Sequence, residues 1–172
     1  MYADILILGQ LLSGPKHGYE IKKSVQEALG DSFGLNNNAL YPALRRFAEA
    51  GAITKETEKG DGKPDRHVYV LTQSGETTFT QLVCDFSEKA AVHQMEFLVR
   101  VALFGRLRPE NRLAILEKRL AAIEEQSGRN RKFDRQGDND LFIAEVIEFQ
   151  KQQTEHERVW IERLIRETRD GK

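Results

Sequence analysis

Three consecutive asparagines stand directly before an apolar-periodic run that also carries a tyrosine and two arginines. An asparagine amide offers a hydrogen-bond donor beside an acceptor, which matches the major-groove edge of adenine, and arginine reaches guanine or phosphate. The first backbone N–H groups of a helix, at the positive end of its dipole, also attract phosphate. We therefore expect this segment to contact double-stranded DNA, through Asn36, Asn37, Asn38, Tyr41, Arg45 and Arg46.

The same residues also have purely structural interpretations. One asparagine can be the N-cap of the helix, and another can adopt a left-handed turn, because asparagine tolerates a positive φ. Tyr41, like Tyr19 earlier in the chain, can pack its ring in the core and keep its hydroxyl in water. Pro42 lacks a backbone N–H, which a first helical turn tolerates, so we expect the helix to begin near Asn38.

Two further groups of basic residues flank this segment in the sequence. Lys16, His17, Lys22 and Lys23 precede it, and Lys59, Lys63, Arg66 and His67 follow it. We expect phosphate contacts from them, chiefly from Lys16, His17, Lys63 and Arg66. Asp61 and Asp65 in the stretch "GDGKPDR" oppose close approach to phosphate, and surface lysines often do no more than solvate a protein.

The periodicity around these residues predicts short helices followed by a hairpin. Apolar residues recur at helical spacing over 3–12, 18–30 and 38–51, and each stretch ends at a glycine or glycine-proline break. Residues 53–71 then alternate around a polar tip, which is typical of two strands. Three helices and a two-stranded wing, ending near Thr72, form a winged helix-turn-helix.

The remaining sequence predicts long helices and therefore a mainly α protein. Apolar spacing runs almost unbroken from Glu76 to Phe104, from Pro109 to about Glu125, and from Leu141 to about Thr168. A loop is expected over 127–140. Apolar faces of this length must be buried against another surface, and we expect a second copy of the chain to supply it. A monomeric helical hairpin is the alternative. The residues expected at the dimer interface are Phe86, His93, Phe97, Phe142, Val146, Phe149, Gln153, His156 and Trp160.

Three segments together resemble the PadR family of bacterial transcriptional regulators. They are "ILILGQLLSGPKHGYEIKKSV", "NNNALYPALRRFAEAGAI" and "RHVYVLTQSG", in the family's order and spacing. The resemblance implies a DNA-binding domain over 1–75 and a helical dimerisation domain over 76–172, as in the larger PadR subfamily. This chain has Asn38 and Ala39 where the family usually has glycine and threonine, which puts base preference there in doubt.

The family resemblance also implies a small-molecule effector. Phe97, Phe149 and Trp160 are the candidates to line a pocket for an aromatic effector, with plain core packing as the alternative. His93 and His156 fall on the seams of two helices, and either meet or are satisfied separately. No enzyme motif or metal-ligand spacing occurs, so we expect neither catalysis, nor a cofactor, nor a metal.

Composition adds few constraints. The net charge of −1, from 26 basic and 27 acidic residues, neither requires nor excludes nucleic acid. The single cysteine, Cys84, excludes an internal disulfide and is expected to be buried. No segment predicts a signal peptide or a membrane span, so a cytoplasmic location is expected.

We therefore expect a homodimeric transcriptional regulator, a repressor, that binds an inverted-repeat operator. The alternatives are a protein-interaction adaptor, which the neutral charge and acidic wing tip favour, and a small-molecule or metal sensor without DNA affinity.

Overall fold

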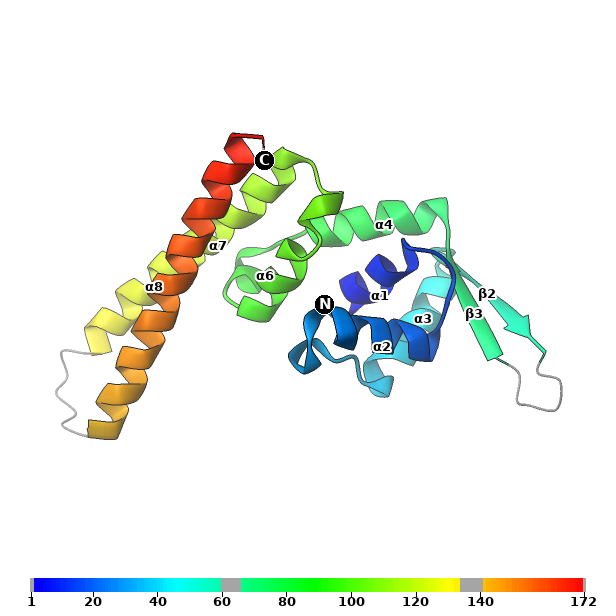
Figure 1. Cartoon of the computed structure of the whole chain (residues 1–172), viewed down its shortest axis with the longest axis horizontal. Coiled ribbons are helices and arrows are strands. Elements are labelled where there is room, and N and C mark those ends of the chain that lie inside the picture. Colours follow the sequence, from blue (N-terminus) through cyan, green and yellow to red (C-terminus); the bar gives the residue numbers. More distant parts are fainter. Residues whose placement is uncertain (1, 60–65, 134–140, 172) are drawn as a thin grey trace. The chain divides into compact units, whose positions relative to one another are not determined.

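The computed structural model describes residues 2–59, 66–133 and 141–171, with only the backbone for 128–133. The chain divides into two compact units, Met1–Asp85 and Phe86–Lys172 (Figure 1). The first is a winged helix-turn-helix and the second is helical, as the sequence predicts. The boundary that we expected after Gly75 falls inside a helix, α4 (Gln73–Cys84), which packs on the first helix of unit 1.

Helix α1 (Tyr2–Leu11) is the central element of unit 1. Its consecutive residues Ile5, Leu6, Ile7 and Leu8 are all buried, so it has no water-facing stripe over this stretch. Helices α2, α3 and α4 and strand β3 all contact it, which explains why an apolar run without amphipathic spacing is stable here. The chain leaves α1 through Gly14, whose φ of 121° suits glycine.

Helices α2 (Gly18–Leu29) and α3 (Asn37–Glu49) form the helix-turn-helix. Ile21 and Val25 turn the apolar face of α2 inward, and Gly30 ends the helix at a φ of 85°. A short 3-10 turn, η1 (Asp31–Phe33), leads to α3. Tyr19 was expected to pack in the core, but it is exposed on α2.

The sheet has one strand more than the sequence predicts. β2 (Ile53–Glu58) and β3 (Arg66–Leu71) pair antiparallel, with Ile53 opposite Leu71, and form the expected wing. A two-residue strand, β1 (Lys16–His17), pairs with the other edge of β3, giving the order β1-β3-β2. Two residues carry no periodicity, so no sequence pattern indicates β1.

Helix α4 begins against the turn that ends α3. Thr72 is its N-cap, since its Oγ1 accepts a hydrogen bond from the Gly75 N–H at 3.1 Å and donates to the Gly51 carbonyl at 2.8 Å. A Cβ placed on Gly75 would lie 2.0 Å from the Ala52 carbonyl oxygen. The helix therefore approaches this turn more closely than any residue with a side chain allows. Cys84, expected to be buried, is exposed near its end.

The continuous helix predicted over 76–104 is wrong. The chain instead forms α4, then α5 (Glu88–Ala91), α6 (Gln94–Val101) and a 3-10 turn, η2 (Phe104–Arg106). Ser87 starts α5 by accepting a hydrogen bond from the Ala90 N–H, and His93 has extended backbone dihedrals before α6. Apolar spacing does not reveal these breaks, because each short helix still buries one face.

Two long helices complete unit 2 and pack on each other. They are α7 (Pro109–Phe133) and α8 (Leu141–Arg169). α7 extends past the end expected near Glu125, so residues 127–133 are helical rather than part of a loop, while 134–140 lie outside the described residues. Ile161 and Ile165 of α8 are buried together with Ile115, Leu116 and Ile123 of α7.

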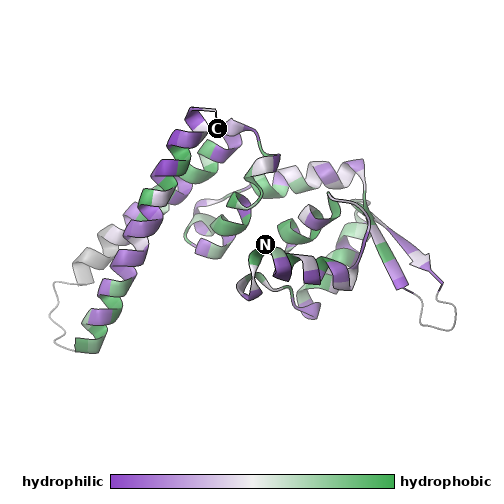
Figure 2. Cartoon of the chain, in the orientation of Figure 1, coloured by the Kyte–Doolittle hydropathy of each residue, from purple (hydrophilic) through white to green (hydrophobic). Residues whose placement is uncertain are grey.

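Hydropathy is arranged differently on the two ends of α8. The end near Leu141 is largely hydrophobic in Figure 2, although Leu141, Phe142 and Val146 are all exposed. The end near Arg169 places its apolar residues inward. Within the described residues, no helix has the length and apolar content that a membrane span requires.

We expect Gly75→Ala to destabilise unit 1 by about 3 kcal/mol, because the added methyl overlaps the Ala52 carbonyl. Urea unfolding followed by circular dichroism measures the change. Gly105→Ala is the matched control, since nothing lies within 4 Å of a Cβ at that position. Equal unfolding midpoints for the two variants would contradict the close approach.

Candidate nucleic-acid interface

Helix α3 presents a polar face that no part of unit 1 covers. Leu40, Ala43, Leu44 and Phe47 are buried against the unit, and the opposite face is exposed. Asn37, Tyr41 and Arg45 recur every four residues along that exposed face, and Asn38 lies beside them in the first turn. The structure thus places four of the predicted contact residues on one accessible surface.

Asn36 has the structural role that was its alternative. Its side-chain oxygen accepts a hydrogen bond from the Ala39 N–H at 2.8 Å, which makes it the N-cap of α3. No asparagine among the described residues has a positive φ, so the second alternative does not apply. Pro42 is the sixth residue of the helix rather than part of its first turn. Its missing N–H therefore leaves the Asn38 carbonyl without the usual donor four residues later.

Arg46 is also exposed on α3, but its guanidinium has a partner within unit 1. Its guanidinium pairs with Asp4 of α1 and lies 5.2 Å from the centre of the Phe47 ring. The side chain therefore ties α3 to α1, and its contact with DNA stays a prediction. Arg45, one residue earlier, is exposed with no ion pair in the described part of the chain.

His17 is also held by the protein itself. Its Nδ1 lies 3.1 Å from the carbonyl oxygen of His67, and its Nε2 lies 3.6 Å from a Glu58 carboxylate oxygen. The His17 backbone N–H donates to Glu20 at 2.7 Å. His17 therefore joins the start of α2 to the wing, while its neighbour Lys16 is partly exposed on β1.

The wing supplies Arg66, which is exposed at the start of β3. Lys63, predicted to contact phosphate, lies outside the described residues. Arg66 borders a shallow hollow of about 300 Å³ together with residues from β1, α2, α3 and β3. These are His17, Gly18, Tyr19, Tyr41, His67 and Tyr69. Tyr41 leans on the bare backbone of Gly18, where a Cβ would lie 3.0 Å from its Cε1 atom.

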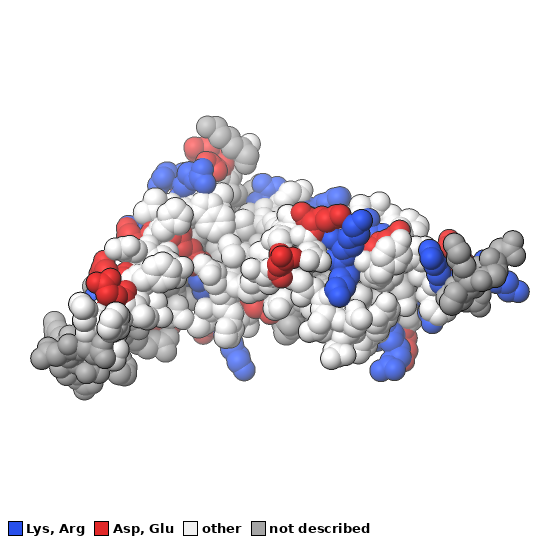
Figure 3. Space-filling view, turned by 60° about the horizontal axis from the view of Figure 1, so that its bottom comes forward, with Lys and Arg blue, Asp and Glu red and all other residues white. Residues whose placement is uncertain are grey.

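Charge alone does not mark this surface. On the face drawn in Figure 3, basic and acidic side chains are interspersed rather than gathered in a patch of one sign. The distinctive feature of unit 1 is therefore a set of amide, phenol and guanidinium donors at the start of α3 and beside the wing.

The first unit matches a known family. Residues 7–81 match the model of the transcriptional regulator PadR-like family. This segment is similar to that family. A negative transcriptional regulator, PadR, from Bacillus subtilis is 35% identical over 69 residues, which are 40% of this chain and 38% of that protein. The matched segment therefore spans well under half of the curated relative.

Solved structures of PadR-like proteins are also similar. A PadR family transcriptional regulator from Eggerthella lenta is 29% identical with a TM-score of 0.40, covering 45% of this chain and 65% of that one. Bacillus subtilis PadR, solved in complex with operator DNA, is 20% identical with a TM-score of 0.46, covering 96% and 98% of the two chains.

The unit that follows the PadR-like segment keeps part of its predicted seam exposed. Phe142, Val146, Phe149, Gln153 and His156 all face solvent on α8, and Phe149 is 60% exposed. The residues by which α8 packs on α7 lie further along the helix, at Glu157, Ile161 and Ile165. The described protomer therefore leaves this stripe uncovered.

Three other residues expected at the dimer interface instead build the interior of unit 2. The Phe86 and Phe97 rings stack 6.3 Å apart, and Trp160 meets Phe97 edge-on at 5.9 Å. Phe86 and Phe97 are buried, so we correct their assignment to a partner contact, and Trp160 is half-buried.

The proposed trio of effector-binding aromatics is not assembled. Phe97 and Trp160 touch each other in the interior, whereas Phe149 lies on the exposed stripe of α8. His93 and His156 are both exposed, and no contact between them occurs in the part of the chain that the structure describes.

A groove of about 1090 Å³ opens instead between α7, α8 and the start of α6. At its floor, Arg119 and Glu157 form a bidentate ion pair at 2.8 and 2.9 Å, with exposed fractions of 4% and 8%. Arg119 also donates to the Ala91 and Val92 carbonyls, and Gln94 donates to Glu157. The groove is thus polar at its base.

Sequence reasoning missed this buried network. Arg119 lies among apolar neighbours on α7, which is a signal that a buried cation has a partner on another helix. The partner itself, 38 residues later, was not indicated by spacing. At the rim, Arg158 donates to Glu155 and holds the pKa of that carboxyl below its usual range.

We expect Arg119→Met to destabilise unit 2 by about 3 to 5 kcal/mol, because Glu157 is left charged and buried. The double variant Arg119→Met, Glu157→Met should recover most of that loss, since two apolar side chains then fill the site. Urea unfolding measures both. A double variant as unstable as the single one would show that the pair does not dominate the packing of α7 on α8.

Proposed function

We propose that this protein is a homodimeric DNA-binding transcriptional regulator that acts as a repressor in the cytoplasm. The observation that carries the proposal is the exposed face of α3, where Asn37, Asn38, Tyr41 and Arg45 project together from a helix docked by its other face. The match of residues 7–81 to the transcriptional regulator PadR-like family supports it.

In this proposal, the amino-terminal end of α3 enters the major groove. The amides of Asn37 and Asn38 then reach base edges, and the first N–H groups of the helix face a phosphate. Arg45, two turns further along the same face, reaches a guanine or the backbone. Asn36 contributes indirectly, because as N-cap it fixes where the helix begins.

The exposed stripe of α8 supports the dimer. Phe142, Val146 and Phe149 lie on one face with Gln153 and His156 continuing the same line. Large apolar side chains in a row are costly in water and are typical of a covered interface. A second copy of α8 supplies a matching surface, and the two polar residues set the register. The dimer then holds two α3 helices for two half-sites of an inverted-repeat operator.

Repression is proposed from the curated relative, and effector control from the groove of unit 2. The Bacillus subtilis relative is named a negative regulator, which favours repression. Effector control follows if a ligand binds more tightly to a dimer whose two α3 helices do not match the half-sites than to the DNA-binding dimer. The ligand then shifts the equilibrium by that difference in affinity. The polar groove between α7 and α8 is the place we propose for that ligand, instead of the three aromatics.

We expect Asn37→Ala and Arg45→Ala each to weaken binding to a selected operator about tenfold or more, because each removes a major-groove contact. Fluorescence anisotropy at fixed salt measures the affinity. Lys89→Ala is the control, since it removes an exposed charge from α5, outside unit 1, and its affinity should change by no more than about twofold. Unchanged affinity in both test variants would contradict the proposed reading surface and favour a protein-interaction adaptor.

We expect Phe149→Asp to convert the dimer to monomer at concentrations where the wild type is dimeric, because it buries a charge in the apolar interface. Sedimentation equilibrium measures the mass. Ala144→Asp places the same charge on an exposed position away from the stripe and should leave the dimer intact. A dimer that survives Phe149→Asp would place the interface elsewhere.

A further inference from the structure

The hollow beside the wing gathers side chains from four elements of unit 1. It is bordered by His17 of β1, Tyr19 of α2, Tyr41 of α3 and Tyr69 of β3, with Arg66 at its edge. Tyr69 is only 6% exposed, yet it forms part of the wall. A largely buried phenol that borders an open hollow directs its remaining accessible surface into that space.

Several of these donors have no partner among the residues that the structure describes. The Tyr41 and Tyr69 hydroxyls and the Arg66 guanidinium make no hydrogen bond or ion pair to any described residue. No described side chain has a fully buried polar atom without a partner, so the Tyr69 hydroxyl is open to solvent through the hollow and can donate to a bound acceptor. Burial, followed by the nearby Tyr41, raises the pKa of Tyr69, so its hydroxyl keeps its proton and remains a donor.

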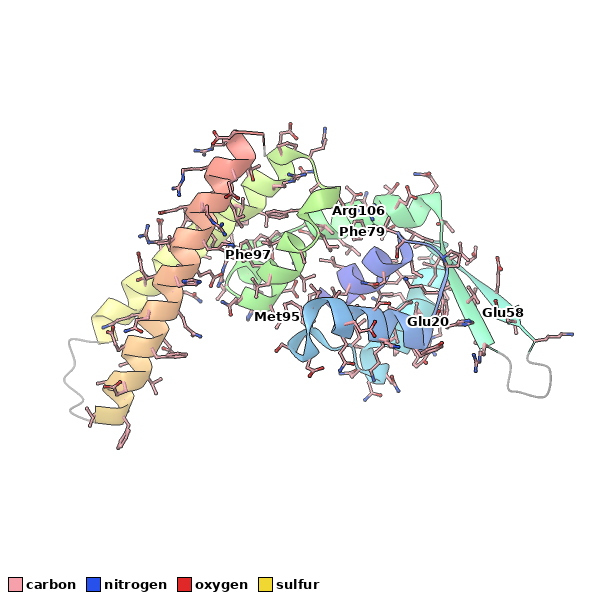
Figure 4. The ribbon with its side chains drawn as sticks, in the orientation of Figure 1. Glu20, Glu58, Phe79, Met95, Phe97 and Arg106 are labelled. Carbon is pink, nitrogen blue, oxygen red and sulfur yellow. The ribbon has the colours of Figure 1, made fainter. Side chains whose placement is uncertain are left out.

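The acidic groups around the hollow are already engaged. Glu20 accepts from the His17 backbone N–H at 2.7 Å and from the Tyr19 hydroxyl at 3.4 Å. Glu58 faces the Nε2 of His17, and Figure 4 shows these two carboxylates on α2 and on β2. His67 contacts the Thr57 hydroxyl through Nδ1 at 3.2 Å.

Two lysines extend the positive side of the site. In the sheet register, Tyr69 lies opposite Lys16 on β1 and opposite Lys55 on β2. Side chains directly opposite each other in antiparallel pairs share a face of the sheet, so both lysine stems begin beside Tyr69. The donors of the hollow therefore have a lysine beside them on each of two strands, β1 and β2.

We propose that this hollow binds one phosphate of the operator backbone, with Tyr69, Tyr41 and Arg66 as its donors. The proposal rests on the proposed function, because it concerns the same DNA. Phosphate oxygens accept only, and the unpartnered groups here can all donate, so the chemistry is complementary. Tyr41 belongs to α3, so a phosphate bound here fixes the height and rotation of that helix in the groove.

Gly18 is the feature that keeps the hollow open on one side. Any side chain at that position would meet the Tyr41 ring at 3.0 Å and move it. Next to it, the His17 and Tyr19 rings lie nearly parallel at 6.0 Å, which gives a flat wall along which a sugar can lie. Base edges are read by the other end of the surface, at Asn37 and Asn38.

The test is a scan of single neutral methylphosphonates through a duplex selected for binding from a random pool, with wild type and Tyr69→Phe compared. For the wild type, one position in each half-site should weaken binding about tenfold beyond the general loss from removing one charge. Tyr69→Phe should weaken binding to the unmodified duplex about tenfold and show no extra loss at that position. Arg66→Ala should lower the salt slope of log Kd by about 1, and Tyr69→Phe should leave it unchanged.

Two controls separate the outcomes. Tyr2→Phe removes a hydroxyl from α1, and Lys89→Ala removes an exposed charge from α5, so neither should change the scan. If the wild type binds the duplex and Tyr69→Phe loses nothing, or loses equally at every position, the phosphate site is overturned while the regulator stands. A Tyr69-dependent rise in melting temperature with inorganic phosphate, without any sensitive duplex position, would overturn the DNA phosphate in favour of a free anion. A wild type with no selective binding overturns both proposals.

Discussion

The packing of α3 in unit 1 determines which of its side chains any partner can meet. Leu40, Leu44 and Phe47 bury one face, and the salt bridge from Arg46 to Asp4 fixes the helix against α1. With that face occupied, helical geometry alone turns Asn37, Tyr41 and Arg45 outward. The N-cap at Asn36 sets the first residue of the helix, and thus which amides stand at its positive end. A shift by one residue would bring Asn38, Pro42 and Arg46 to the places of Asn37, Tyr41 and Arg45.

The wing and the start of α2 depend on this same placement. Tyr41 rests on Gly18, and His17 links that turn to His67 and Glu58 of the hairpin. Three elements that are distant in sequence therefore meet around one hollow, and movement of α3 would be felt in all of them. Close contacts of this kind transmit small displacements because protein interiors have little free volume.

Unit 2 is organised by a different interaction. A buried arginine is stable only with a good partner, and Arg119 obtains four acceptor contacts from Glu157 and two carbonyls. That requirement fixes the carboxyl-terminal half of α8 against α7. The exposed stripe of Phe142, Val146 and Phe149 lies in the other half of the helix, so the two units separate the proposed tasks of reading DNA and pairing with a second copy.

Much of unit 1 was predictable because its signals are local. Caps, glycine breaks and helical spacing predicted α1, α2, α3 and the wing, and the exposed face of α3 contains four of the predicted residues. Strand β1 was not predictable, since two residues have no period and depend on β3 fifty residues later. The pairing of Arg46 with Asp4 was hidden for the same reason: it depends on how helices dock rather than on spacing along one of them.

Unit 2 was less predictable because apolar spacing indicates which residues are buried but not whether the helix that carries them is unbroken. Residues 76–104 keep one phase across the breaks at Asp85 and His93, so three short helices read as one. Phe97 and Phe149 have the same spacing pattern, yet one is fully buried and the other mostly exposed. Whether such a residue is buried depends on the helix that packs against it, and the spacing within one helix does not identify that helix.

The central claim is that a dimer places two α3 helices in successive major grooves on one face of a duplex. Hydroxyl-radical footprinting of the selected duplex tests it most directly. The account predicts two protected tracts on the same face, related by twofold symmetry and centred about one helical turn, roughly 34 to 36 Å, apart. A single protected tract, or uniform protection along the duplex, would contradict it.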